Sequence, residues 1–460
     1  MSVSRERDGR WDSTVLFFLL VGIVFISRLP FLDAGYGTQP DAWRVAMTAR
    51  SIALTGEYSA SRLPGYPLHE LVCSLFWRGG PWVLNGLTAL FSGIAGGFFA
   101  LSLKRLGSHR YILGGLALSF VPVIYVNSTM SLDNVWALAF ILAALYFVLV
   151  NRTLVAGICL GVAIGCRITS AAMMVPMVLL LAHGNDRQEA LQRIFKLCVP
   201  ATIIGAAAFA IVFATYGPGF FRFSEHGYPA VADIIRRATV DVWGVLGIVG
   251  LLAAMILFVI NSSKLRSIKT DSSARIQLLA WLVAIAIYTI AYLRLPHQSR
   301  YLIPAVPFII LALETILTER SFSFVCIILL FSSFIGGAGR SGLRPGAIFS
   351  EYTARKQDMV TIAQVAALGD AFPNKAVVVS GWWLPKIEGT LFATSRGMTD
   401  YVYLLDATEL RKRLGDGFAL YYLPGIREYN TQVYGVDLAK FGAKPLLPDG
   451  TPTHTARTRP

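Results

Sequence analysis

The chain has 460 residues, of which 55% are hydrophobic and only 15% are charged, and its mean hydropathy is +0.58. Soluble domains carry about 25% charged residues, so this composition excludes an ordinary soluble protein. The formal net charge is +14, but the basic residues flank apolar segments and form no run interleaved with aromatic residues, which argues against nucleic-acid binding. The five cysteines fall in or beside apolar segments without a CxxC pair, so we expect neither disulfides nor a cysteine metal site.

Long apolar stretches predict a multi-spanning α-helical membrane protein. The first stretch, residues 15–26, follows several arginines but no small-x-small cleavage site comes after it, so we interpret it as an uncleaved helix. We predict about eleven spans. The two short spans around Arg167 have an alternative interpretation as one broken hairpin. The predicted spans are 14–32, 82–103, 111–126, 134–150, 153–166, 168–182, 196–216, 241–260, 276–293, 301–318 and 322–336.

The distribution of basic residues predicts the orientation. With the N-terminus in the cytoplasm, 15 of the 41 Lys and Arg residues fall in or beside the short cytoplasmic segments, whereas the long first outer loop, residues 33–81, has few for its length. The positive-inside rule applies best to short loops. We therefore expect a multi-pass protein of the inner (plasma) membrane with a cytoplasmic N-terminus, and an odd number of spans places the C-terminus outside.

The composition becomes mixed after the membrane domain, residues 1–336. Residues 337–353 begin glycine-rich and predict a linker rather than a phosphate-binding loop, because no strand precedes them. Residues 354–446 alternate a helical pattern (354–371) with strand patterns and predict a small extracytoplasmic α/β domain. The predicted strands are 376–380, 401–405 and 418–423. The tail, 447–460, has a disordered composition.

Ionisable residues near a membrane are candidate functional groups because their burial is expensive. In the first outer loop, Asp41 precedes apolar residues at helical spacing, which predicts an amphipathic helix along the membrane interface. The simpler interpretation of Asp41 is an N-cap of that helix. A second interfacial segment follows the turn at residues 62–67 and carries His69 and Glu70.

Several short motifs occur along residues 10–320. They are Pro40-Asp41 with Ala46, Gly56-x-Tyr58, Pro64-Gly65-Tyr66-Pro67, Ser131-Leu132-Asp133-Asn134, Gly161-x-x-x-Gly165-x-Arg167 and Arg300-Tyr301-Leu302-x-Pro304-x-x-Pro307. Together these motifs resemble GT-C-fold glycosyltransferases, the enzymes related to protein O-mannosyltransferases and lipid A aminoarabinose transferases. Many relatives have an Asp-Glu pair in the first loop, whereas here Ala42 follows Asp41.

The resemblance implies inverting transfer of a sugar from a polyprenyl-phosphate donor to an envelope glycan, lipid or protein at the outer face of the membrane. An acceptor hydroxyl needs a base, for which Asp41 and then Asp133 are the candidates. The leaving phosphate needs cations, and Arg is suited to bind it bidentately. The candidate cations are Arg62, Arg167, His297 and Arg300. No cluster here has metal-ligand spacing, so we expect no cofactor. Some relatives use a divalent cation, and this stays the alternative.

Each candidate also has a simpler interpretation. Arg167 at a helix junction can snorkel to the interface, Arg62 can be an exposed loop residue, and Asp133 can cap the helix that follows it. His297 and Arg300 can lie at the interface without binding a ligand. Weaker candidates are Glu57, Glu70, Glu225-His226 and Trp382-Trp383. Core packing is the best explanation for the two tryptophans.

Two other functions remain open at this stage. A transporter or flippase of a lipid-linked sugar explains many spans, but transporters tend to show internal repeats and broken helices at the bilayer midplane. We find no repeated half, and the ionisable residues gather at one face. A structural subunit that recruits partners explains the C-terminal domain but leaves Asp41 and the arginines without a role.

Overall fold

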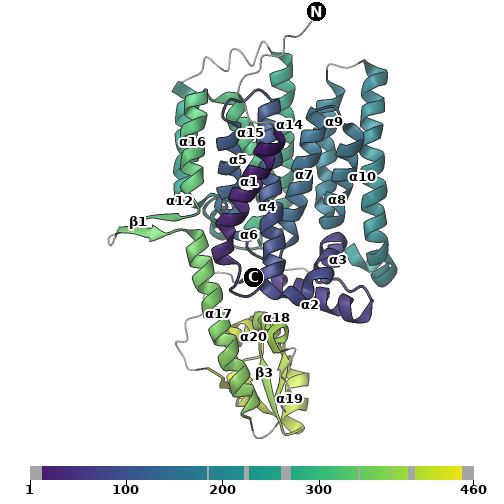
Figure 1. Cartoon of the computed structure of the whole chain (residues 1–460). Coiled ribbons are helices and arrows are strands. Elements are labelled where there is room, and N and C mark those ends of the chain that lie inside the picture. The colour runs from purple at the N-terminus through teal and green to yellow at the C-terminus, as the bar shows by residue number, and fades with distance from the viewer. Residues whose placement is uncertain are drawn as a thin grey trace, which may run out of the picture.

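The computed structural model describes residues 13–183, 186–221, 227–260, 271–339, 342–372, 375–391 and 399–447. It is a bundle of long helices with a small α/β domain at one end (Figure 1). The candidates Glu225 and His226 and almost all of the tail predicted to be disordered lie outside these residues.

Every predicted span overlaps one or two helices of the bundle. Within the described residues, six helical segments are long and apolar enough to cross a membrane: 13–31, 67–105, 187–220, 240–260, 272–294 and 299–316. The chain is therefore a multi-spanning membrane protein, and the total of eleven spans stays a prediction. The bundle helices are α1 (Ser13–Arg28), α4 (Gly80–Arg105), α5 (Tyr111–Phe120), α6 (Pro122–Asn127), α7 (Asp133–Leu149), α8 (Thr153–Cys166), α9 (Met174–Ala182), α10 (Arg187–Tyr216), α11 (Val231–Ala238), α12 (Val240–Ile260), α14 (Ser272–Arg294), α15 (Val306–Ile316) and α16 (Glu319–Phe331).

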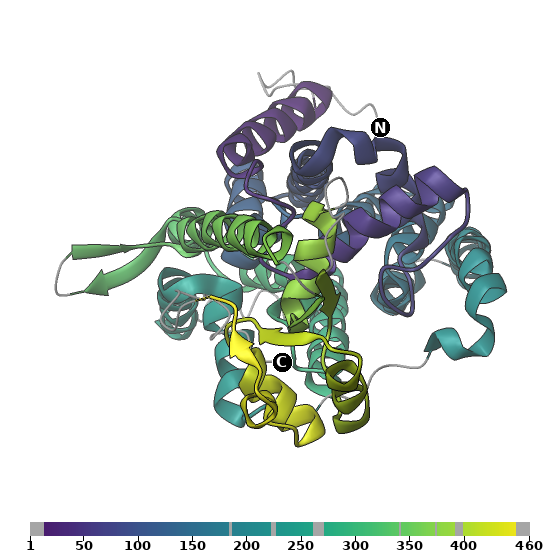
Figure 2. The same cartoon turned by 90° about the horizontal axis from the view of Figure 1, so that it is seen from below.

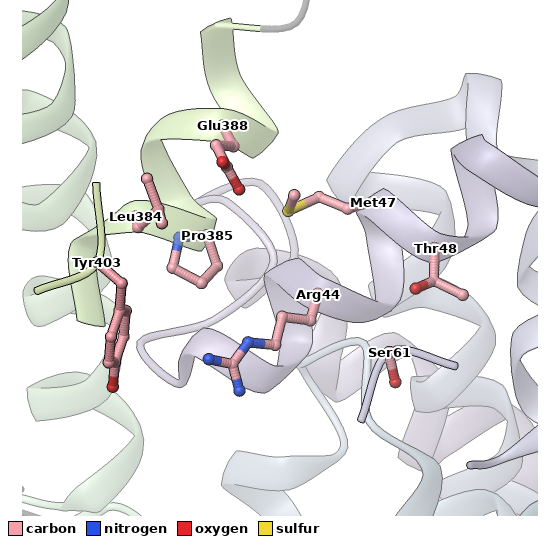
Figure 3. A pocket seen from close by; sticks show the side chains of 8 residues that line it. All are labelled: Arg44, Met47, Thr48, Ser61, Leu384, Pro385, Glu388 and Tyr403. Atoms are coloured by element: carbon pink, nitrogen blue, oxygen red, sulfur yellow. The ribbon is translucent and has the colours of Figure 1, made fainter. Parts of the chain in front are cut away.

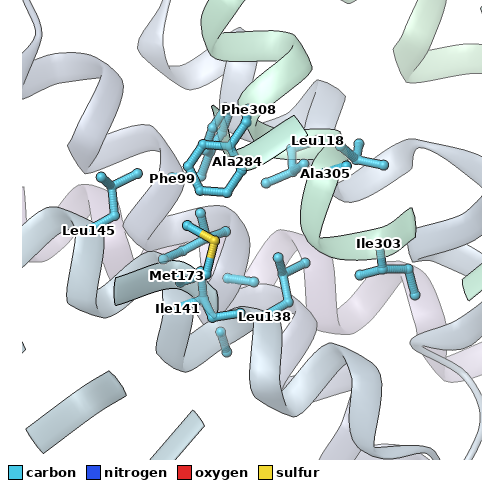
Figure 4. Close-up of a cluster of buried hydrophobic side chains, with 14 of the residues drawn as sticks. Phe99, Leu118, Leu138, Ile141, Leu145, Met173, Ala284, Ile303, Ala305 and Phe308 are labelled. Carbon is cyan, nitrogen blue, oxygen red and sulfur yellow. The ribbon is translucent and has the colours of Figure 1, made fainter. Parts of the chain in front are cut away.

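Small residues allow the bundle helices to approach closely. Gly157, Gly161 and Gly165 recur every four residues on α8 and face α10, and a Cβ on Gly157 would lie only 2.5 Å from the carbonyl oxygen of Leu197. Such small-xxx-small faces are typical of packed membrane helices. Large apolar side chains from other helices fill the centre of the bundle (Figure 4). This packing holds the end of α8, and the Arg167 that follows it, in a defined place.

Two short helices lie across the end of the bundle, as the amphipathic pattern predicts (Figures 1 and 2). They are α2 (Pro40–Thr55) and α3 (Pro67–Phe76). The predicted apolar face of α2 is buried along most of the helix, including Ala42, Val45 and Ala49, whereas Ala53 near its end is exposed. Gly56 ends α2 in the left-handed region, with φ of 73°, which favours glycine at this position. The first loop is therefore an ordered helical layer.

The C-terminal domain is α/β, as the alternation predicts. Its parallel four-stranded sheet has the order β4-β3-β5-β6, and the central strand β3 is completely buried. The strands are β3 (Ala376–Val379), β4 (Thr399–Val402), β5 (Ala419–Tyr422) and β6 (Lys444–Pro445), and the helices are α17 (Ala347–Asp370), α18 (Leu384–Leu391), α19 (Ala407–Gly415) and α20 (Ile426–Tyr434).

The segment before this domain differs from the predicted linker. An antiparallel hairpin of β1 (Ile335–Gly339) and β2 (Gly342–Pro345) occupies its first half, and α17 begins at Ala347 rather than near residue 354. Glycine suits this tight pairing, since a Cβ on Gly336 would lie 2.4 Å from the carbonyl oxygen of Pro345. The span predicted to end at residue 336 ends with α16 at Phe331.

The α/β domain is docked on the bundle at α2. Arg355 of α17 is buried and donates to the carbonyl oxygens of Phe31, at 3.2 Å, and Thr129, at 2.8 Å. Trp43 of α2 belongs to the apolar core of the domain, and Gly389 of α18 leaves room for its ring. The helix that carries Asp41 is therefore held between the bundle and the domain. The start of α1 lies at the opposite end of the bundle (Figure 1).

Candidate functional site

Five predicted site residues from distant segments meet at this end of the bundle, and we call them the ionic cluster: Asp41, Arg62, Asp133, Arg167 and Arg300. At its centre is the fully buried Asp133. Its Oδ1 accepts from Nη2 of Arg62 at 2.6 Å, and its Oδ2 accepts from Nη1 of Arg167 at 2.6 Å. One carboxylate thus holds two guanidinium groups in place.

Asp41 forms the second half of the cluster. Its Oδ2 accepts from Nη2 of Arg300 at 2.5 Å and lies 3.5 Å from Nε of Arg62. Its Oδ1 lies 3.4 Å from Nη1 of Arg44, on the outer side of α2. Arg62 therefore bridges the two carboxylates, and the two oxygens of Asp41 have different neighbours.

The interpretation of these aspartates as helix caps is wrong. The N-cap of α2 is Gln39 and that of α7 is Leu132, and neither cap makes a side-chain hydrogen bond. Asp41 and Asp133 lie inside the first turns, where a carboxylate also suits the helix dipole. Asp133 and Oδ2 of Asp41 pair with arginines from other segments, because a buried guanidinium group without a partner is costly.

Glu70 of α3 holds the loop that presents Arg62. Its buried carboxylate accepts from the hydroxyl of Tyr58 at 2.5 Å, from the backbone and hydroxyl of Ser61 at 2.8 and 2.5 Å, and from the backbone of Tyr66 at 3.2 Å. These contacts flank Arg62 on both sides. Glu70, a weaker candidate in the sequence, thus anchors the loop and lies outside the ionic cluster.

Two tyrosines line the arginines, and their role is not evident from the sequence alone. The guanidinium carbon of Arg62 lies 4.1 Å from the ring centre of Tyr66, and that of Arg167 lies 5.3 Å from the ring centre of Tyr301. Cation–π contacts of this kind stabilise desolvated guanidinium groups. Both tyrosines belong to the motifs that carry the family resemblance, so those motifs could have identified them as site residues.

Arg167 and Arg300 stand at breaks in the helical structure. Arg167 is extended, with φ of −159°, between α8 and the 3-10 helix η3 (Ile168–Met173). Arg300 is the second residue of another 3-10 helix, η5 (Ser299–Ala305), which precedes α15. Both are nearly buried, with 9% and 3% of their surface exposed, so neither snorkels freely to an interface.

Positive charge predominates in the ionic cluster, which holds three guanidinium groups against two carboxylates. Burial alone raises the pKa of the Asp41 carboxyl, but the charges of Arg62, Arg300 and Arg44 outweigh it and hold that pKa well below its usual range. Asp41 is therefore ionised, and one positive charge of the cluster remains uncompensated.

Some guanidinium nitrogens of the cluster have no hydrogen-bond partner among the described residues. They are Nε and Nη1 of Arg300 and Nη1 of Arg62, and all three are buried. Buried donors without partners are rare because each costs about 1–3 kcal/mol. The ionic cluster therefore combines surplus positive charge with buried N–H groups that have no partner among the described residues. The described residues contain no group of three or more His, Cys, Asp or Glu residues that would hold a metal ion.

Other predicted candidates lie outside the ionic cluster. His297 is half-buried in the turn before η5, and its backbone N–H donates to the Leu295 carbonyl. Glu57 is exposed after the end of α2. Trp383 is buried in the core of the α/β domain, whereas Trp382 is half-buried, with its ring centre 5.3 Å from that of Tyr429.

Comparison with known proteins identifies the fold. No family model matches the sequence, and no curated protein matches it significantly. Among solved structures, ArnT from Cupriavidus metallidurans bound to undecaprenyl phosphate has a TM-score of 0.50 and 16% identity, covering 78% of this chain and 72% of its own. The chain has a GT-C-like fold.

The same enzyme in its apo state has a TM-score of 0.47 and 14% identity, over 86% of both chains. At such identities the likeness concerns the fold alone.

Proposed function

We propose that the chain is a membrane glycosyltransferase that moves a sugar from a polyprenyl-phosphate donor to an envelope glycan, lipid or protein, with inversion. The observation that carries this proposal is the ionic cluster: buried guanidinium N–H groups of Arg62 and Arg300 without partners, beside an ionised carboxylate. The GT-C-like fold supports it, as does the undecaprenyl phosphate bound in the structure of ArnT.

The arginines would bind the phosphate of the donor. A phosphate oxygen accepting from Arg300 and Arg62 would satisfy their unused donors and offset the surplus charge of the cluster. In the reaction the bond between the anomeric carbon and the phosphate oxygen breaks, and the electron pair leaves with the phosphate. Developing negative charge at this point is stabilised by fixed guanidinium groups, which need no reorganisation.

Asp41 would act as the base, while Asp133 orients Arg62 and Arg167. The acceptor oxygen attacks the anomeric carbon, and its proton passes to the Asp41 carboxylate. Without a donor the pKa of Asp41 is low, which makes it a weak base. A bound phosphate brings a negative charge close to it and raises that pKa. Donor binding would thus prepare the base for the reaction.

We also propose that the end of the bundle that carries α2 and the α/β domain faces outside the cytoplasm. A reporter that is active only in the cytoplasm, fused after Pro460, should stay silent because the positive-inside rule places this side outside. The same reporter fused before Met1 is the control and should be active. Activity of the C-terminal fusion would reverse the topology.

A labelled polyprenyl-phosphate sugar distinguishes a transferase from a flippase. Purified protein in vesicles that contain an envelope extract should move the label from the lipid to an acceptor. Movement of the labelled lipid across the bilayer without any transfer would favour the flippase instead. Empty vesicles control for spontaneous movement and hydrolysis.

A further inference from the structure

Helix α17 holds the segment that leads to the first aspartate of the ionic cluster. It runs from the end of the bundle into the α/β domain (Figure 1). Near its start, Oε1 of Glu351 accepts from the hydroxyl of Thr38 at 2.7 Å and from the backbone N–H of Thr38 at 3.4 Å. Thr38 stands three residues before Asp41, so Glu351 fixes the path of the chain into α2.

One turn further along α17, Arg355 holds the segment that leads to the second aspartate. Its Nη1 donates to the carbonyl oxygen of Thr129 at 2.8 Å, and its Nη2 donates to the hydroxyl of Thr129 at 2.6 Å. Thr129 stands four residues before Asp133, in the loop between α6 and α7. Both Arg355 and Thr129 are buried, and hydrogen bonds from a charged donor are the stronger kind.

Glu351 and Arg355 are also joined to each other. Oε1 of Glu351 lies 3.4 Å from Nε of Arg355. A continuous path of polar contacts therefore runs from Thr38 through Glu351 and Arg355 to Thr129, and we call these four residues the α17 clamp. Each end of the path lies close in sequence to one carboxylate of the ionic cluster.

The two segments that the clamp holds also contact each other. The backbone N–H of Ser131 donates to the carbonyl oxygen of Tyr36 at 3.3 Å. Gly37 lies against Met130, and a Cβ on this glycine would be only 2.8 Å from the methionine sulfur. A shift of one segment would therefore disturb the other.

The spacing of the two aspartates matters because Arg62 bridges them. Its Nη2 lies 2.6 Å from Oδ1 of Asp133, whereas its Nε lies 3.5 Å from Oδ2 of Asp41. The contact with Asp41 is the longer one, so a small displacement of α2 would lose it first. Asp41 would then change its place relative to a donor bound by the arginines.

The α/β domain meets α2 from a second direction. Leu384 and Pro385 of α18 line one side of a pocket of about 270 Å³, and Met47 of α2 lines the other (Figure 3). Trp43 of α2 belongs to the apolar core of the domain. The domain therefore holds the helix that carries Asp41, and the α17 clamp extends this hold to the segment before Asp133.

We propose that Glu351 and Arg355 are positioning residues, which fix Asp41 and Asp133 relative to each other through the α17 clamp. The α/β domain is then part of the framework of the ionic cluster. The expected effect on sugar transfer rests on the proposed glycosyltransferase function, whereas the coupling of the two segments does not.

Loss of the clamp should affect turnover more than donor binding. Arg62 is presented by the loop that Glu70 anchors, and Arg300 lies in η5, so neither is held by the clamp. Both arginines should stay in place to bind the donor phosphate. The proposed base, Asp41, should be less well placed for the acceptor hydroxyl, and small misplacements of reacting groups are costly.

The test compares Glu351→Ala with Gln364→Ala in the full-length protein. Both variants shorten a polar side chain on α17, but Gln364 is exposed and lies outside the clamp. A second pair covers poor folding of Glu351→Ala: Thr38→Val removes only the hydroxyl that Glu351 binds, and Thr38→Ser restores it. Backbone hydrogen exchange over residues 128–134 is measured by mass spectrometry, and turnover and donor KM are measured with a labelled polyprenyl-phosphate sugar.

Glu351→Ala and Thr38→Val should exchange about tenfold faster over residues 128–134, because they lose a hydrogen bond to a charged group. Both changes are made on the Asp41 side of the path, so faster exchange on the Asp133 side reports transmission through the clamp. Turnover should fall about tenfold or more, with a donor KM close to that of the wild type. Thr38→Ser and Gln364→Ala should match the wild type in every measurement.

Wild-type exchange over residues 128–134 in both Glu351→Ala and Thr38→Val would overturn the proposal, because the two segments would then be independent of α17. Wild-type turnover in both variants would overturn it as well, and so would a weaker donor KM in place of the lower turnover. A wild-type protein that transfers no sugar would refute the glycosyltransferase function instead. The hydrogen exchange would still decide whether the clamp couples the two segments.

Discussion

Replacing Asp41 with Asn should lower the turnover of sugar transfer by about 10²–10⁴-fold, the usual cost of removing a general base. The amide keeps the size of the side chain and still accepts a hydrogen bond from Arg300, but it does not take a proton at neutral pH. The donor KM should stay the same or fall, because Arg300 and Arg62 lose a competing carboxylate. Steady-state kinetics with a labelled donor separates the two quantities.

Asp41→Ala provides the comparison. It removes both the base and the partner of Arg300, so it should be as inactive as Asp41→Asn but less stable, since it leaves a buried guanidinium unpaired. If Asp41 served only as the ion-pair partner of Arg300, Asp41→Asn would lose donor affinity and melting temperature together. A fully active Asn variant would exclude Asp41 as the base, and Asp133 would become the leading candidate.

Replacing Arg300 with Gln should weaken donor affinity by roughly 30-fold to several thousand-fold, the range for truncating one partner of a buried charge pair. Arg300 is 3% exposed and holds two of the three guanidinium nitrogens of the ionic cluster that have no partner among the described residues. Turnover should fall as well if the contact tightens on the departing phosphate. The donor KM and turnover of the variant check both effects.

Arg300→Lys should restore only part of the affinity, because an ammonium group lacks the planar fork of guanidinium. Arg427→Gln is the control, since Arg427 forms an ion pair with Asp437 in the α/β domain, outside the ionic cluster. Donor kinetics that stay at wild-type values in both Arg300→Gln and Arg167→Gln would remove these arginines from the donor site.

Local patterns predicted the elements of this fold well. Hydropathy located the helices of the bundle apart from α11, and helical spacing located α2, because both signals depend only on neighbouring residues. The same local reasoning failed for the caps. It interpreted Asp41 and Asp133 as helix caps. Their partners in the structure, Arg300 and Arg167, lie 259 and 34 residues away in the sequence, so local patterns do not reveal them.

The convergence of the ionic cluster was accessible only through the family resemblance. No periodicity brings Arg62 and Arg300 to one carboxylate, since that requires the packing of α2, α7 and η5. Arg44 was missed because it lies on the polar face of α2, where a solvated arginine is the ordinary expectation. The hairpin at β1 and β2 was missed because a glycine-rich stretch favours a flexible linker as much as a tight turn.

The binding of undecaprenyl phosphate tests the central claim most directly. The claim is that the unused guanidinium groups of the ionic cluster hold a lipid phosphate, and binding is measured without knowing the sugar or the acceptor. The wild type and Asp41→Asn should both bind it, and a double variant, Arg62→Gln with Arg300→Gln, should lose most of that affinity while Arg427→Gln keeps it. Equal affinity of the double variant and the wild type would contradict the account.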